Sequence, residues 1–167
     1  MKTSIKPLAR TLLLTLAVAA APAVAGGPAT TGALATPANR IVGLWAVEAT
    51  VRLCSNPAAT PRVIRNTLLF HAGGTVTENP GTLPTVAGAG RSFGIGTWNY
   101  DPASERYGGM LRFDNYLNGV YSGYQTVDRD LQLNGDDAGN GAVVVTSYNT
   151  DDVALVQLCG TFVQTRL

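Results

Sequence analysis

Alternation of apolar and polar residues is the feature that most constrains the fold of this chain. The apolar residues at odd positions of Gly43–Cys54 alternate with Glu48, Thr50 and Arg52. This period of two places one face of an extended strand in a core and the other face in water. Similar runs follow, separated by turn residues at short intervals, and no long segment shows helical periodicity. The further strands are expected at Arg62–His71, Thr75–Thr77, Arg91–Tyr100, Tyr107–Tyr116, Val120–Arg129, Ala142–Asn149 and Val153–Arg166, with Leu131–Leu133 extending one of them or standing alone.

Eight or nine short strands predict an all-β domain, which is an antiparallel barrel or a sandwich. The length of 167 residues suits one domain. We expect that domain to occupy residues 41–167.

The first 25 residues have the layout of a secretory signal peptide. A basic start with Lys2, Lys6 and Arg10 precedes an apolar run over residues 12–20, and residues 23–25 form an Ala-Val-Ala cleavage site. The alternative is a transmembrane anchor, for which the apolar run is short. We therefore expect residues 1–25 to be removed on export, which makes the protein periplasmic or secreted. Residues 26–40, rich in Gly, Ala, Pro and Thr, are expected to be a flexible leader.

The charges of the exported chain exclude several classes of function. Removing 25 of the 167 residues leaves 142, with nine arginines, no lysine and 11 acidic residues, so the net charge is −2. Such a chain has no basic patch for nucleic acid and no lysine for a Schiff base. One histidine and two cysteines do not suffice for a multi-histidine zinc site. We expect no metal, no cofactor and no stable membrane insertion after the signal is removed.

The two cysteines predict how the sheet closes. An exported chain can be oxidised, so Cys54 and Cys159 are expected to form a disulfide between the first strand and the last. In an antiparallel pair, the residue numbers of facing partners have a nearly constant sum. The residue numbers of Cys54 and Cys159 add up to a value only two larger than those of Trp45 and Arg166. The first and last strands are therefore expected to pair and to close an up-and-down antiparallel barrel of about eight strands. A sandwich with neighbouring termini is the alternative.

Two sequence features at the start of the first expected strand and the end of the last resemble those of a known family. The Gly-Leu-Trp sequence at residues 43–45 and Arg166 near the end of the last strand resemble the calycin superfamily, the lipocalins and their barrel relatives. The resemblance implies a lipocalin-like barrel of a secreted bacterial type, in which Trp45 plugs one end and Arg166 packs across it. It also implies that the interior binds a small, mostly apolar ligand without catalysis.

Aromatic side chains with polar tips are the candidate lining of a ligand cavity. They suit a wall that is apolar and still makes a few hydrogen bonds. A filled core is the alternative, because an eight-stranded barrel has room for at most one small ligand. The candidates are Trp98, Tyr100, Tyr107, Tyr116, Tyr121 and Tyr124.

Catalysis has little support in the sequence, and no catalytic residue is expected. The single histidine, His71, ends an expected strand without an orienting acid nearby, and the chain has no Gly-x-Ser-x-Gly motif. One alternative function is a cofactor-free isomerase or cyclase in which tyrosine hydroxyls, His71 and Arg112 converge, although alternation favours an outward position for Arg112 and Asp114. Another is an extracellular interaction or inhibitor protein that makes contact through the loop Asn79–Gly90.

Overall fold

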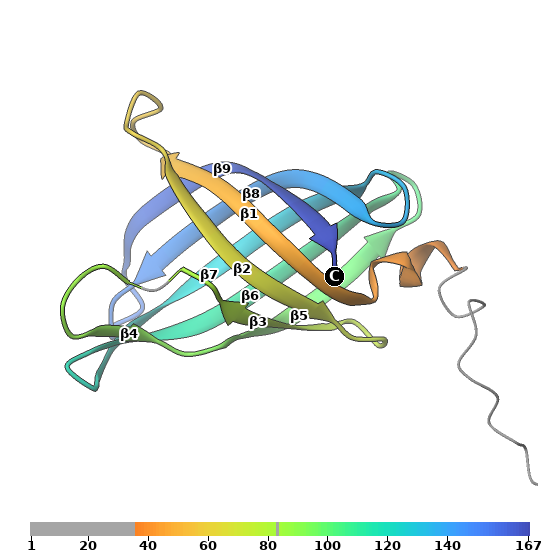
Figure 1. Cartoon of the computed structure of the whole chain (residues 1–167). Coiled ribbons are helices and arrows are strands. Elements are labelled where there is room, and N and C mark those ends of the chain that lie inside the picture. The colour runs from red at the N-terminus through yellow and green to blue at the C-terminus, as the bar shows by residue number, and fades with distance from the viewer. Residues whose placement is uncertain (1–35, 83) are drawn as a thin grey trace, which may run out of the picture.

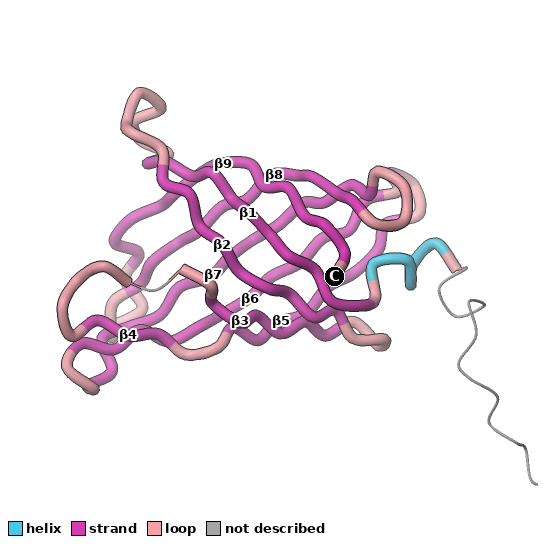
Figure 2. Tube along the Cα trace, in the orientation of Figure 1, coloured by secondary structure: helices cyan, strands magenta, loops and turns pink. Residues whose placement is uncertain are grey.

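The computed structural model of the protein describes residues 36–82 and 84–167. The expected signal peptide and residues 26–35 of the expected leader lie outside this part of the chain. Figures 1 and 2 show that the described residues form strands joined by turns, with one short 3-10 helix before the first strand. The elements are η1 (Pro37–Ile41), β1 (Gly43–Leu53), β2 (Arg62–Phe70), β3 (Thr75–Pro80), β4 (Ala89–Arg91), β5 (Gly94–Asp101), β6 (Arg106–Leu117), β7 (Val120–Leu133), β8 (Ala138–Tyr148) and β9 (Ala154–Arg166).

Eight of these strands form a closed antiparallel barrel in up-and-down order. The pairing runs from β1 through β2, β3, β5, β6, β7, β8 and β9, and β9 returns to β1 (Figure 1). The short β4 pairs with the end of β6 that lies beyond the β5 ladder. The closed all-β barrel expected from the sequence is confirmed, and the alternative sandwich is excluded.

The seam between β1 and β9 has the register that the residue numbers predicted. Trp45 faces Arg166 and Arg52 faces Cys159 in one antiparallel ladder. Cys54 lies just beyond this ladder, and its disulfide to Cys159 joins positions 105 apart in sequence. The predicted disulfide is therefore confirmed. In the chain-entropy account, a cross-link that closes so long a loop stabilises the fold by up to about 4–5 kcal/mol.

Inward-facing side chains fill most of the barrel, because each strand turns alternate residues inward. In β1 the buried residues are Trp45, Val47, Ala49 and Val51, the same face that the alternation predicted. The other strands contribute a matching inner face to one continuous core. Its remaining buried apolar members are Ile41, Leu68, Phe70, Val76, Trp98, Tyr107, Leu111, Phe113, Val127, Leu131, Val143, Val145 and Phe162.

Two boundaries differ from those expected. The end of the expected leader, residues 37–40, belongs to η1. This helix packs on the barrel, where its residue Ile41 is only 1% exposed. The loop expected over Asn79–Gly90 is shorter at both ends, because β3 continues to Pro80 and β4 begins at Ala89. Both differences come from pairing or packing with residues distant in sequence, which local composition does not report.

Candidate functional site

One end of the barrel is closed by η1 and by two side chains of the β1–β9 seam. The indole Nε1 of Trp45 donates a hydrogen bond to the carbonyl of Ile41 at 2.7 Å. The guanidinium of Arg166 lies 4.3 Å from the centroid of the Trp45 ring. It also donates to the carbonyls of Val42 at 2.8 Å and Arg40 at 2.5 Å. These contacts hold the chain entering β1 across the barrel end, so that Trp45 and Arg166 act together in closing it.

Three of the six aromatic candidates, Trp98, Tyr100 and Tyr107, lie inside the barrel. Tyr107 packs against both of the others, with ring centroids 6.2 Å from Trp98 and 4.9 Å from Tyr100. Trp98 Nε1 donates to the carbonyl of His71 at 3.0 Å, and the Tyr107 hydroxyl donates to the carbonyl of Pro37. Burial raises the pKa of Tyr107. The polar tips of Trp98 and Tyr107 are therefore bonded to the protein's own backbone.

The other three aromatic candidates, Tyr116, Tyr121 and Tyr124, do not line the interior cavity. Tyr124 lies on the outer face, stacked on Tyr148 at 4.7 Å between ring centroids and covered by the Arg112 guanidinium at 3.8 Å. Tyr116 and Tyr121 contact each other beside the turn between β6 and β7, with ring centroids 6.3 Å apart. The buried positions of β7 are odd-numbered, which leaves Tyr124 outside, and the extra residue Ser122 in β7 shifts the register between Tyr116 and Tyr121.

The groups of the alternative isomerase lie in three different places. Arg112 approaches Asp114 at 3.6 Å on the outer face, as expected, with 52% of its side chain exposed. His71 follows β2, and its Nε2 is 3.3 Å from the Thr77 hydroxyl. The hydroxyl of Tyr107 is bonded within the closed end. The tyrosine that Arg112 does contact, Tyr124, lies on the outer face, so no cavity in the described part of the chain brings Arg112, His71 and a tyrosine hydroxyl together.

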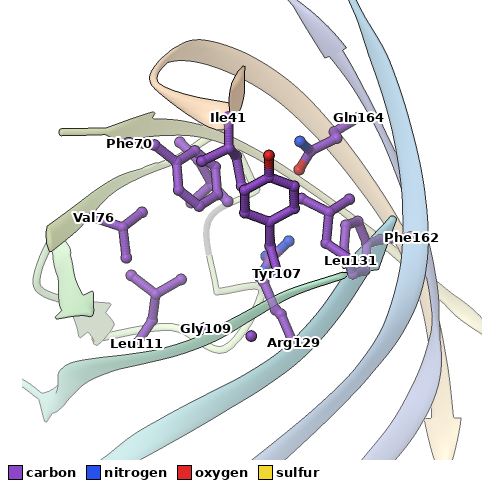
Figure 3. A pocket seen from close by; sticks show the side chains of 12 residues that line it. Ile41, Phe70, Val76, Tyr107, Gly109, Leu111, Arg129, Leu131, Phe162 and Gln164 are labelled. Carbon is purple, nitrogen blue, oxygen red and sulfur yellow. The ribbon is translucent and has the colours of Figure 1, made fainter. Parts of the chain in front are cut away.

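A small cavity lies inside the barrel beneath η1 (Figure 3). Its volume is about 10 Å³, which is roughly the space needed for one water molecule. Ile41 is contributed by η1 and the other lining residues by strands, whose positions are fixed by their ladders. The cavity is lined by Ile41, Leu68, Phe70, Val76, Tyr107, Gly108, Gly109, Leu111, Arg129, Leu131, Phe162 and Gln164.

Arg129 is the unusual member of this lining. Its Cζ lies 4.8 Å from the centroid of the Phe162 ring. The residue as a whole is half-buried, but its Nε and Nη1 atoms are fully buried, and no hydrogen-bond acceptor among the described residues reaches either of them. Burial lowers the pKa of the guanidinium to about 10, and the nearby charge of Glu78 opposes this shift. Two of the three guanidinium nitrogens are therefore buried without a hydrogen-bond partner within the described residues.

Gln164 is a second unpartnered polar group on the same cavity. The residue is 2% exposed, and neither its Nε2 nor its Oε1 has a hydrogen-bond partner within the described part of the chain. Figure 3 shows the Gln164 amide and the Arg129 side chain, from β9 and β7, both directed toward the space around Tyr107. An unmade hydrogen bond of a buried polar group costs about 1–3 kcal/mol. Two such groups on one cavity mark it as a candidate binding site.

A second buried polar cluster, formed by Glu78, Arg91 and Asn66, is paired internally at its charged groups, while Asn66 Oδ1 has no hydrogen-bond partner within the described residues. Glu78 is 3% exposed, and its carboxylate forms an ion pair with Arg91. Asn66 Nδ2 donates to Glu78 Oε1 at 2.5 Å, and the Arg91 guanidinium lies 3.3 Å above the centroid of the Phe113 ring. The negative charge of Glu78 is thus neutralised by Arg91. Arg129 is left as the uncompensated charge of the barrel interior.

Sequence reasoning missed Arg129 and Gln164, although a signal was present. Arg129 shares its strand face with Val127 and Leu131, both of them buried. Gln164 shares the inward face of β9 with Phe162. Extending the alternation of each strand to its polar residues would have placed both inside the barrel.

Comparison of the chain with protein-family models and with curated proteins finds no match. The closed antiparallel barrel is consistent with a lipocalin-like fold. The disulfide fits an extracellular or periplasmic location. Within the described residues there is no helix of the length and apolarity that crossing a membrane requires.

Proposed function

We propose that the protein is an exported barrel that binds a small, mostly apolar molecule in its interior without catalysis. The observation that carries this proposal is the cavity on which Arg129 and Gln164 present buried polar atoms that the described residues do not satisfy. Buried polar groups in proteins are almost always hydrogen-bonded. A bound molecule that meets these atoms, with its remaining surface against the aliphatic and aromatic lining, fits this arrangement.

The cavity has to enlarge for a molecule bigger than water to enter. Ile41 is the lining residue outside the barrel wall, and η1, which carries it, is bonded to the wall through Tyr107, Trp45 and Arg166. Movement of Ile41 with η1 opens the cavity without breaking a strand ladder. Entry from this end is therefore part of the proposal.

The remaining identifications belong to the same proposal. The Trp45–Arg166 closure supports membership of the calycin superfamily, and the disulfide supports export by the N-terminal signal. Cleavage near residue 25, followed by residence in the periplasm or outside the cell, is expected. N-terminal sequencing of the exported protein tests this directly.

Native mass spectrometry of the protein, isolated without denaturation, tests the binding function. We expect a bound small molecule, or a rise in melting temperature when the protein is mixed with a panel of small apolar acids and alcohols. The Gly109→Ala variant adds a methyl group at the cavity wall, where a Cβ would lie 3.6 Å from the Thr97 carbonyl oxygen and 3.9 Å from Trp98 Cβ. It is expected to fold normally and to lose binding.

Gly90→Ala is the matched control, because the added Cβ lies 4.0 Å from Tyr116 Cβ and Gly90 is not a cavity residue. This variant is expected to bind as the wild type does. An unliganded mass together with no response to the panel would refute the proposed function. Equal binding by Gly109→Ala and wild type would place any bound molecule elsewhere.

A further inference from the structure

Part of the barrel surface at the end away from η1 has no charged residues. Residues 84–90, in the loop before β4 and in β4, and residues 115–127, in β6, β7 and the turn between them, contain no Asp, Glu, Arg or Lys, although 14% of the chain is charged. The two segments lie together, because Ala89 faces Leu117 in the ladder of β4 and β6. Figure 1 shows both of them at the end of the barrel away from η1.

The same two segments expose large apolar side chains. Four of these, which we call the apolar tip, are Val86, Leu117, Val120 and Tyr121, with exposed fractions of 66%, 47%, 69% and 41%. The turn between β6 and β7 projects into open space, since no described atom beyond the chain neighbours lies within 4 Å of a Cβ placed at Gly119. Neighbouring exposed apolar side chains mark an interaction surface more often than scattered ones do.

The charged residues nearby limit the extent of this uncharged surface. The β8–β9 turn at the same end of the barrel carries Asp151 and Asp152, and β2 begins at that end with Arg62. At the η1 end, three of the six residues at 101–106 and two of the four at 134–137 are charged. The uncharged surface is therefore confined to the β6–β7 turn and the loop beside it, and both turns at the other end are suited to water.

A lipid surface fits the apolar tip better than a protein partner does. The tip lines neither the interior cavity nor the groove on the outer face of β1. It therefore offers no pocket for a partner's side chain, whereas the residues that dominate protein interfaces fill such pockets. A fluid bilayer surface needs no pocket and accepts a convex apolar turn. Tyr121 also suits the boundary between acyl chains and headgroups, because its ring is apolar and its hydroxyl is polar.

We propose that the apolar tip docks reversibly on the surface of a lipid bilayer, with Val86, Leu117 and Val120 against the upper acyl chains and Tyr121 at the level of the headgroups. Because the tip has no charge, the attraction is apolar and not ionic, so it is insensitive to salt and to the charge of the lipid. This contact is peripheral and is not a stable insertion into the membrane. It goes beyond the binding of a small molecule in the interior and does not depend on it.

Flotation of the disulfide-bonded protein with lipid vesicles tests the proposal. One set of vesicles is pure phosphatidylcholine, and the other contains equal parts of phosphatidylcholine and phosphatidylglycerol. We expect the wild type to float equally with both sets, at low and at high salt. Val120→Asp is expected to weaken the binding at least about 10-fold, because an apolar contact is lost and a charge has to be desolvated.

Leu167→Asp is the matched control, because Leu167 is 70% exposed but lies at the C-terminus, near the η1 end (Figure 1). It is expected to float as the wild type does. Gly109→Ala, which narrows the interior cavity, is also expected to float normally, and this separates docking from the uptake of a lipid into the barrel. Circular dichroism shows whether each variant has folded.

Val120→Trp keeps the test decisive if Val120→Asp fails to fold. It places an indole at the tip, whereas Trp45 and Trp98 are buried in the core. We expect its fluorescence emission to shift to shorter wavelength when vesicles of either composition are added. The wild-type emission is expected to stay nearly constant.

Four outcomes would overturn the proposal. The first is a wild type that floats with neither set of vesicles, together with an unshifted emission of Val120→Trp. The second is flotation that requires the anionic lipid and disappears at high salt, since charge then drives the contact. The third is an equal loss in Val120→Asp and Leu167→Asp, which places the contact elsewhere. The fourth is a dimer in solution that Val120→Asp makes monomeric and that binds no vesicles, since a second copy of the chain then covers the tip.

Discussion

The barrel buries two arginines in very different surroundings. Arg91 pairs with Glu78 and lies over the ring of Phe113, and Asn66 donates to the same carboxylate. Arg129 has the ring of Phe162 beside it, but its buried Nε and Nη1 have no acceptor within the described residues. Burial alone does not distinguish a structural arginine from a binding one. The presence or absence of a partner does.

The ion pair of Glu78 and Arg91 is expected to stabilise the fold. Glu78→Ala leaves Arg91 buried without its carboxylate, and breaking a buried ion pair in this way costs about 3–5 kcal/mol. Urea denaturation measures the change in the free energy of unfolding. Glu48→Ala is the control, because it removes an exposed partner of Arg65 whose contact at 2.7 Å is worth about 0–1 kcal/mol. Equal losses for the two variants would show that Glu78 and Arg91 are not the structural pair described here.

Substitution of Arg129 is expected to change the free energy of unfolding in the opposite direction. Without ligand, Arg129→Met replaces an unpartnered buried cation by an apolar side chain of similar length, so the free energy of unfolding is expected to rise by about 1–3 kcal/mol. The same denaturation experiment measures it. Arg62→Met is the control, because it removes the same charge from an exposed position on β2, and it is expected to stay near the wild type. A large loss of stability in Arg129→Met would mean that Arg129 holds the fold together, as Arg91 does.

The stability of the wild type relative to Arg129→Met is expected to depend on pH. Burial lowers the pKa of Arg129 to about 10, while Glu78 from β3 opposes the shift and the neighbouring Tyr107 from β6 has a raised pKa. Above about pH 10 the unfolded chain binds more protons at this position than the folded chain, so the wild type gains stability relative to the variant as the pH rises. Unfolding curves of both proteins between pH 8 and 11 measure this gap, which is the difference between their free energies of unfolding. A gap that stays constant would contradict the burial of an unpaired charge.

The smallest effect is expected at Gln164. Gln164→Leu removes an amide that is buried without partners. We expect the free energy of unfolding of the ligand-free protein to rise by about 1 kcal/mol. The contrasting substitution is Asn66→Leu, which removes a donor to Glu78 and is expected to destabilise the fold. Thermal unfolding in parallel measures both. Equal losses of stability in the two variants would remove the distinction between Asn66, which donates to Glu78, and Gln164, whose Nε2 and Oε1 both lack a partner within the described residues.

The fold was more predictable from the sequence than the site was. The period of two and the numbering of the cysteines depend on local geometry, and they predicted the register of β1 and β9. The position of Arg129 on an inward face was also available from alternation. The lack of a partner for Arg129 could not be predicted from alternation. It depends on Glu78 pairing instead with Arg91, which lies on a short strand beyond the loop. The outer position of Tyr124 was likewise available from strand parity, which was given less weight than aromatic character.

A crystal structure of the disulfide-bonded protein with a small apolar molecule that the binding panel identifies tests the central claim most directly. We expect a polar group of the molecule within hydrogen-bond distance of Arg129 or Gln164, its apolar body beside Phe70 and Leu131, and Ile41 displaced with η1. An unchanged Ile41, with only water at Arg129 and no bound molecule inside the barrel, would contradict the account.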